Sequence, residues 1–442
     1  MKSYRERRGL DPREPVLSGR CYVDNALVFT VKGTPKVLKA AKAAVEGGPA
    51  PAGGVTEVLE YVRACKGRAR LTALYRGRNA KVYSAEKMEM ALTPEDEAPR
   101  AHHVQLADRA DGAVLEKKLR AHPDVRRVYR PVIQYPLDFV PMAAPGAPGG
   151  GPPGDETWGI DKCRFPEVWD ELDRADATDP IAVIDQGKDY GHAELAGRVT
   201  TREIPDRQAA PSESIHASAV MGVLAAARGD DAGMSGCCSA PIDLYNVWTT
   251  EDGFDSNGFY QALEMVANSG ARVLNLSLGS TVSDSEVRDR IAECVARDVI
   301  VVAAMGNEAA AGNPKFYPAA YPGVIAVGAT TRFDRRTRFS STGDHVHVAA
   351  PGEGIFTVFG ADEFEDAHGT SFAAPMVSAA VWLILRARPC WRLKEVKEAL
   401  AASAVLRTGV LPKEVGHGRL DMVRLLKEVK NRPCGHPGHT LV

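Results

Sequence analysis

The sequence lacks the features that would assign it to a membrane, an export route or a nucleic acid. No apolar stretch of about 18 residues stands out, so we expect no membrane span. Residues 1–8 are mostly polar or charged, and no apolar core of a secretory signal follows them, which favours a cytoplasmic location. The formal net charge of −2 gives no reason to expect nucleic-acid binding.

Cysteine pairs with the spacing of a zinc site are also missing. The chain has 8 cysteines and none of them forms a Cys-x-x-Cys pair. Because no export signal is visible, we expect their thiols to remain reduced, as is usual in the cytosol. Cys434, His436 and His439 are residue types that bind metals, but they are few and lie near the C-terminus on a predicted flexible tail. The cysteines and histidines therefore predict no metal site.

The chain is long enough for two domains, and its composition shows where they meet. Proline, glycine and alanine dominate 141–154, a segment that cannot bury a core and is typical of an exposed linker. We predict a small α+β domain over 1–140, a linker over 141–157, a larger domain over 158–430 and a flexible tail over 431–442.

The small domain is predicted from segments with strand or helix patterns. The expected strands are 21–31, 80–92, 103–106 and 125–132, and the expected helices are 35–45, 55–65 and 112–122.

The larger domain alternates short apolar strands with helices. The expected strands are 181–184, 244–247, 273–277, 299–304, 324–327 and 346–349, and the expected helices are 216–227, 258–269, 284–297 and 371–388. Near-continuous apolar strands that alternate with helices are typical of a sheet covered on both faces. The sequence therefore predicts an α/β fold with a doubly wound, largely parallel sheet.

A serine motif at 368–377 is the most informative segment of the chain. Gly369 allows a sharp turn, and Ser371 is expected to start a buried helix, where unpaired backbone N–H groups favour negative charge. Pro375 is expected to cost little there, because first-turn N–H groups have no partner within the helix. Taken alone, Ser371 could equally be an ordinary capping residue.

Three other polar residues lie at comparable positions in the chain. Asp185 ends the apolar run that begins at Ile181, His216 opens a helix of small residues, and Asn307 follows the strand over 299–304. Each alone has a structural alternative, since such residues are common at strand ends and turns. In open α/β sheets, however, ligand sites form at the carboxyl ends of strands. Together with Ser371, these residues predict a converging site.

The set resembles the subtilisin-like serine peptidases, the subtilase family, over about 158–423. The order Asp185, His216, Asn307, Ser371 matches that family, and so do the segments 274–279, 317–322 and 339–343. Before the linker, 115–129 is similar to the end of the inhibitor prodomains of subtilases. The chain departs from the usual histidine motif at Ala217 and Ala219, so we expect at most a reduced or narrower activity.

The resemblance implies a serine endopeptidase that acts on proteins or peptides. His216 would be the general base for Ser371 and Asp185 would orient its imidazole, while Asn307 and the Ser371 N–H would bind the oxyanion.

Other segments of the same motifs are expected to bind the substrate. Ser277, Leu278 and Gly279 would form the strand that pairs with the substrate. The side chain before the scissile bond would lie between this strand and Gly306, where Met305 makes the wall bulky.

The resemblance also implies regulation and leaves alternatives open. Residues 1–140 would act as an intramolecular inhibitor, with 130–139 in the cleft and cleavage between 134 and 158. Catalysis would need no cofactor, although subtilases often bind calcium, for which Glu194 and the pair at 230–231 are candidate ligands. A catalytically silent peptide-binding relative and a serine hydrolase that is not a peptidase remain alternatives.

Overall fold

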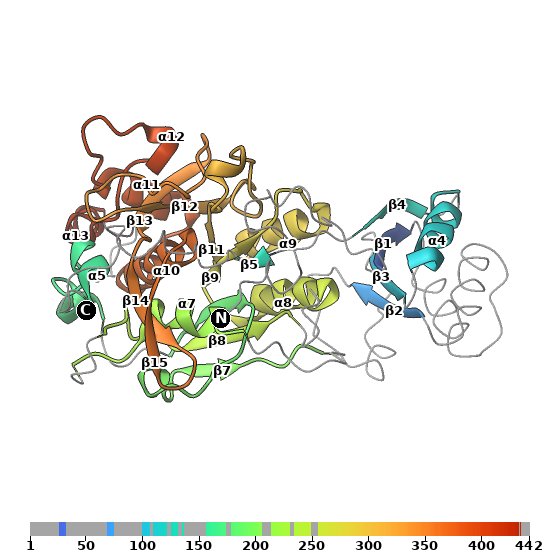
Figure 1. Ribbon diagram of the computed structural model, residues 1–442, viewed down its shortest axis with the longest axis horizontal. Coiled ribbons are helices and arrows are strands. Elements are labelled where there is room, and N and C mark those ends of the chain that lie inside the picture. Colours follow the sequence, from blue (N-terminus) through green and yellow to red (C-terminus); the bar gives the residue numbers. More distant parts are fainter. Residues whose placement is uncertain are drawn as a thin grey trace.

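The computed structural model shows a large α/β domain and a smaller sheet near the N-terminal end of the chain (Figure 1). It describes residues 26–31, 69–74, 100–106, 109–121, 125–130, 135–136, 156–173, 178–205, 214–229, 234–248, 255–432 and 434.

The large domain is built on a seven-stranded parallel sheet with the order β13-β12-β11-β9-β6-β8-β7. The central strands are β11 (Ile300–Ala304), β9 (Val273–Leu276) and β6 (Ile181–Asp185), and the outer ones are β13 (Val346–Pro351), β12 (Val324–Thr330), β8 (Ile242–Asn246) and β7 (Val199–Thr201). The predicted doubly wound parallel sheet is confirmed, and each predicted strand of this domain lies in it. The short edge strand β7 was not predicted, because its residues are polar and partly exposed.

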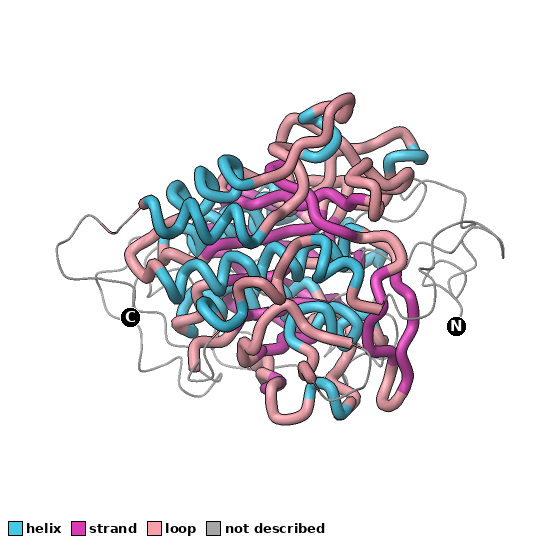
Figure 2. Tube along the Cα trace, turned by 90° about the vertical axis from the view of Figure 1, so that its left-hand side faces the viewer, coloured by secondary structure: helices cyan, strands magenta, loops and turns pink. Residues whose placement is uncertain are grey.

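Helices cover both faces of this sheet (Figures 1 and 2). The helices α7 (His216–Ala225) and α10 (Thr370–Ala387) pack on one face, and α8 (Ser256–Ser269) and α9 (Ser285–Ala296) pack on the other. The strand β6 shows the arrangement, since Ile181 and Val183 belong to one core cluster while Ala182 and Ile184 belong to the other. Alternate side chains of a strand point to opposite faces, so burial on both faces makes the strand apolar throughout.

The helix α10 corrects the expectation that the chain has no apolar stretch of about 18 residues. Its 18 residues are long and apolar enough to cross a membrane by length and composition alone, although no such stretch was recognised in the sequence. Within the protein, 89% of that helix is buried. Small residues such as Ala373 and Ala380 let it lie close to the sheet, so its apolarity is that of a core helix.

Cysteine pairing corrects a second expectation. Cys390 and Cys434 form a disulfide that ties the chain beyond α13 (Met422–Asn431) to the turn before α11 (Leu393–Ser403). The expected reduced state is therefore wrong for these two cysteines, and Cys434 cannot supply a thiolate to a metal. Their separation of 44 residues carries no local signal, because only the packing of α11 on α13 brings them together.

The smaller sheet contains four antiparallel strands in the order β2-β3-β1-β4. They are β2 (Ala69–Leu74), β3 (Arg100–Leu106), β1 (Ala26–Val31) and β4 (Val125–Tyr129), and α4 (Arg109–Ala121) packs on them through Leu115 and Leu119. The strands predicted at 21–31, 103–106 and 125–132 and the helix at 112–122 overlap described elements. The predicted elements at 35–45, 55–65 and 80–92 lie outside the described residues.

Two short strand pairs lie beside the main sheet. The hairpin of β14 (Ile355–Phe359) and β15 (Glu363–Ala367) is separate from the main sheet and leads directly into the serine motif (Figure 1). The strand β10 (Leu278–Gly279) follows β9 and pairs antiparallel with β5 (Tyr135–Pro136), which comes from the segment between the small sheet and the linker. Two segments more than 140 positions apart thus meet beside the carboxyl end of β9.

Candidate active site

A buried pair of Asp185 and His216 forms the first part of the site. Asp185 is the last residue of β6, and His216 is the first residue of α7. The His216 Nδ1 lies 2.5 Å from Asp185 Oδ1, and both side chains are almost fully buried. The backbone N–H of Ala217 donates to the Gln186 carbonyl, which ties the start of α7 to the end of β6. The bond at Nδ1 fixes the orientation of the imidazole ring.

Ser371 lies at the start of α10, directly before the residue whose ring faces that imidazole. The helix begins at Thr370, so Ser371 is its second residue. The ring of the following residue, Phe372, lies 6.2 Å from the His216 ring between centroids. Gly369 precedes the helix with φ +156°, and a Cβ added there would lie 3.2 Å from Asn307 Nδ2. A residue with a side chain is therefore disfavoured at this position by both backbone conformation and space.

The Ser371 backbone is joined to the end of β9 by a buried hydrogen-bond network. Ser277 Oγ donates to the Ser371 carbonyl at 2.9 Å, and Ser371 Oγ donates to the Ser277 carbonyl at 3.4 Å. Asn275 Nδ2 donates to Ser277 Oγ at 3.1 Å, and Ser378 Oγ donates to Asn275 Oδ1 at 2.9 Å. This network holds the start of α10 against the neighbouring strand.

The role of Pro375 differs from the one expected from the sequence. Because α10 begins at Thr370, Pro375 is its sixth residue and not part of the first turn. An ordinary residue there would donate its N–H to the Ser371 carbonyl, four residues back. Proline has no N–H, so that carbonyl accepts the Ser277 hydroxyl instead. The proline thus leaves an acceptor for the neighbouring strand at the serine itself.

The side-chain amide of Asn307 is fixed in orientation beside the start of α10. Its Oδ1 accepts hydrogen bonds from the backbone N–H and the hydroxyl of Thr370, both at 2.9 Å. The N–H of Gly306 donates to the Thr370 hydroxyl at 3.2 Å. With Oδ1 held in this way, the NH2 group is the end of the amide that faces Gly369. Thr370 positions this amide, and sequence reasoning did not single it out.

The predicted substrate-binding residues follow the carboxyl ends of two central strands, β9 and β11. Leu278 and Gly279 form β10, and its partner β5 pairs Tyr135 with Gly279 and Pro136 with Leu278. Gly306 follows β11 and has φ +99°, a conformation that favours glycine. Met305 does not form the wall expected of it, because its side chain is buried in the other core cluster, with Ala303 and Tyr321.

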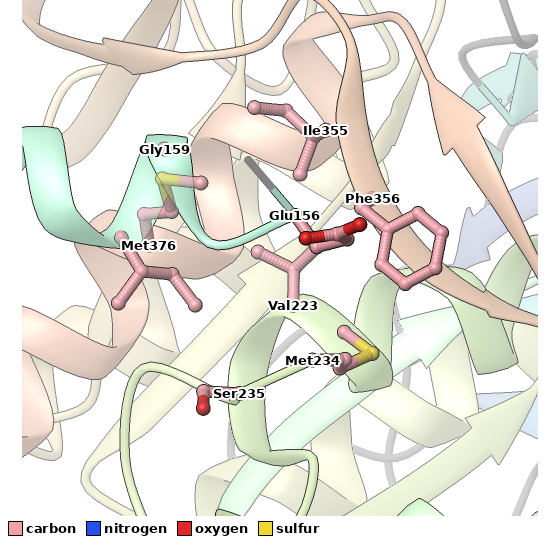
Figure 3. A pocket seen from close by; sticks show the side chains of 9 residues that line it. Glu156, Gly159, Val223, Met234, Ser235, Ile355, Phe356 and Met376 are labelled. Carbon is pink, nitrogen blue, oxygen red and sulfur yellow. The ribbon is translucent and has the colours of Figure 1, made fainter. Parts of the chain in front are cut away.

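A cavity with other lining residues lies between α7, α10 and β14 (Figure 3). It is lined by Val223 of α7, Met376 of α10 and Ile355 of β14, among mostly apolar neighbours. None of the four predicted chemical residues lines it. We therefore assign it to the packing between helices.

Other titratable groups near the site have structural roles. His192 Nδ1 accepts the Glu194 N–H at 3.2 Å and its ring packs edge-on against Phe364. His368 Nδ1 accepts the Gly354 N–H at 3.1 Å, and burial lowers the pKa of His368, which favours this neutral acceptor form. Both rings are therefore engaged away from the serine.

The structure describes only part of the candidate calcium ligands. Among the described residues no group of three or more His, Cys, Asp or Glu side chains could hold a metal ion. Glu194 is buried beside α7, and the acidic pair at 230–231 lies outside the described residues. Calcium binding thus stays a prediction.

Comparison with known proteins agrees with this geometry. The model of the family described as "Subtilase family" matches residues 180–418, which is more than half of the chain. The chain belongs to the subtilase family. It is 30% identical over 227 residues to Subtilisin E of Bacillus subtilis, which covers 51% of this chain and 60% of that protein. It is 31% identical over 231 residues to Thermitase of Thermoactinomyces vulgaris, covering 51% of this chain and 81% of that protein. A subtilisin of Bacillus pumilus is 30% identical over 227 residues, covering 82% of its own length.

In this subtilase, the four residues predicted to carry the chemistry are associated with the carboxyl ends of the central strands. Asp185 ends β6 and Asn307 follows β11, two strands that are separated in the sheet by β9. His216 and Ser371 lie at the starts of two helices on the same face. The structure joins Asp185 to His216 and places Asn307 against Thr370, the residue before Ser371, while the catalytic roles of these residues stay a prediction.

Proposed function

We propose that this subtilase is a serine endopeptidase that hydrolyses peptide bonds in proteins or peptides. The observation that carries the proposal is the buried Asp185–His216 hydrogen bond, whose imidazole lies 6.2 Å between ring centroids from Phe372, the residue after Ser371. A serine hydroxyl is a weak nucleophile until a neighbouring base removes its proton. His216 acts as that base through Nε2, since Nδ1 is bound to Asp185, and it later returns the proton to the leaving amine.

The oxyanion of the tetrahedral intermediate is stabilised by two preorganised donors. One is the backbone N–H of Ser371, which lies in the first turn of α10, where N–H groups have no partner within the helix. The other is the Asn307 amide, whose Oδ1 is already engaged by Thr370. Donors held in place before the reaction stabilise developing charge without reorganisation.

The substrate is proposed to add a strand to β10. The edge of Leu278–Gly279 pairs antiparallel with β5, which supports the same pairing for an extended peptide. Main-chain hydrogen bonds of this kind are independent of side chains, so they supply affinity, and pockets supply the selectivity.

The pairing of β5 with β10 also supports autoinhibition by residues 1–140. Because β5 occupies the edge that a substrate needs, 130–139 would compete with substrate for the cleft. A tethered segment has an effective concentration of about millimolar, so modest affinity is enough to inhibit. Cleavage between 134 and 158 would then release the active enzyme.

A fluorophosphonate probe tests the catalytic proposal directly. The wild-type chain should be labelled at Ser371, located by peptide mapping, while Ser371→Ala should keep its fold and be neither labelled nor active. Absence of labelling in the processed enzyme would favour the silent, peptide-binding alternative. Hydrolysis of simple esters without hydrolysis of peptides would favour the alternative of another serine hydrolase.

A further inference from the structure

Phe316 lies where the side chain before the scissile bond would have to go. A Cβ added to Gly279 would lie 2.6 Å from Phe316 Cδ1, and one added to Gly306 would lie 2.8 Å from Phe316 Cδ2. Such distances mean that the ring is in contact with the backbone of both glycines. The ring therefore fills the space between β10 and the turn after β11, and it is 1% exposed.

The backbone around Phe316 is fixed, so the ring cannot leave by a small loop movement. Ser280 and Tyr317 exchange two backbone hydrogen bonds of 2.8 Å, which join this segment to the chain directly after β10. The Tyr317 ring packs on Tyr321 with 4.9 Å between centroids. Glycine at both 279 and 306 is what allows the phenyl ring to fit between the two segments.

The position of this space follows from the proposed chemistry, on which the inference rests. The carbonyl under attack must lie between Ser371 and the Asn307 amide, and the peptide before it pairs with β10. The side chain of the residue before the scissile bond then extends between Gly279 and Gly306. We infer that Phe316 closes this specificity pocket and restricts the enzyme to small residues, alanine, glycine or serine, before the scissile bond.

The restriction is expected to be large in kinetic terms. One additional methylene in an apolar pocket changes selectivity by about 10–200-fold, and a phenyl group that finds no space is rejected at least as strongly. The sequence pointed to Met305 as the bulky residue, but its side chain belongs to the other core cluster. Phe316 is thus a specificity-determining residue that only the tertiary structure reveals.

The test uses the full-length chain and a matched series of tetrapeptide anilides that differ only in the last residue, Ala, Leu or Phe. The ratio of kcat/KM values between two substrates does not depend on the amount of active enzyme or on a competing inhibitory segment. The wild type should favour Ala over Phe by about tenfold or more. Phe316→Ala should reverse this preference towards Phe, and Phe316→Leu should shift it part of the way.

Phe333→Ala is the matched control, because Phe333 lies in the loop between β12 and β13 and its side chain is 66% exposed. It should keep the wild-type ratio. A wild type that prefers Phe or Leu over Ala, which needs no variant to observe, would overturn the inference while leaving the peptidase proposal intact. An unchanged ratio in folded Phe316→Ala, checked by its melting temperature, would overturn it too. Absence of any hydrolysis together with absence of Ser371 labelling would instead overturn the peptidase proposal beneath it.

Discussion

Replacing Ser277 by alanine tests how the nucleophile is held in place. The Ser277 hydroxyl donates to the Ser371 carbonyl and accepts from Asn275, and all three groups are buried. In the alanine variant the Ser371 carbonyl loses its hydrogen-bond donor, because Pro375 has no N–H to replace it. The variant therefore leaves one buried acceptor and one amide hydrogen unsatisfied.

The magnitude follows from these two groups. An unsatisfied buried polar group costs about 1–3 kcal/mol, so the two groups together should lower the free energy of unfolding of Ser277→Ala by about 2–6 kcal/mol. Pro375→Ala restores an N–H four residues after Ser371, at the position where an α-helix would use it. In the Pro375→Ala background, Ser277→Ala should therefore cost about 1–3 kcal/mol less.

Urea unfolding of the full-length chain, followed by circular dichroism, measures these differences. All variants should also carry Ser371→Ala, because this prevents self-digestion and leaves the serine's backbone carbonyl in place. Ser378→Ala is the control, since its hydroxyl contacts Asn275 but not the Ser371 carbonyl, and Pro375→Ala should not rescue it. Strictly additive effects of Ser277→Ala and Pro375→Ala would refute the proposed role of the proline.

Four further outcomes are expected. Asn307→Leu should lower kcat by about 10²–10³ with little change in KM, a magnitude known from the oxyanion asparagine of subtilisin, a relative of this chain; an unchanged kcat would exclude the oxyanion role. Cys390→Ser opens a loop of 44 residues and should cost about 4 kcal/mol of stability, and its thermal midpoint should match that of the reduced wild type. Burial lowers the pKa of His347 from 6.5 to about 4. The neutral side chain therefore contributes stability above pH 6.5, and this contribution, at most about 3 kcal/mol, is lost as the pH falls towards 4. When the free energy of unfolding is measured between pH 4 and pH 6.5, His347→Gln should depend less on pH than the wild type. Mass spectrometry of the processed chain should place its new N-terminus directly after an alanine or glycine of 141–154, and a start after a large residue would contradict the small specificity pocket.

The elements of the large domain were predictable because their signals are local. The apolar runs before Asp185 and Asn307 are buried on both faces of the sheet, so they contain few polar residues to obscure the pattern. Asp185, His216, Asn307 and Ser371 each lie where a strand ends or a helix begins. Their types and their order along the chain were sufficient to predict that these four distant residues converge in one site. Residue type and position along the chain carried that information.

Other features depend on contacts between distant segments, and no local pattern encodes them. The disulfide of Cys390 and Cys434 forms only because α11 packs on α13. The resemblance leads us to expect 130–139 in the cleft and a pairing strand at 277–279, but the register that pairs Tyr135 with Gly279 has no local signal. The α10 helix was recognised, but the function of Pro375 emerged only with the position of Ser277 on the neighbouring strand.

The proposed substrate selectivity shows most clearly which properties follow from the sequence and which depend on the tertiary structure. The sequence itself determined the fold class, because backbone hydrogen bonding and burial impose periodic patterns that the chain must carry. It also supplied the residues that we propose for the chemistry, through their types and their order. Phe316 has no such pattern: it is one aromatic residue in a loop, and its importance lies in the two glycines on either side of its ring. Gly279 lies in a different segment of the chain from Gly306 and Phe316. Only the packing of the tertiary structure places the two glycines on either side of the ring.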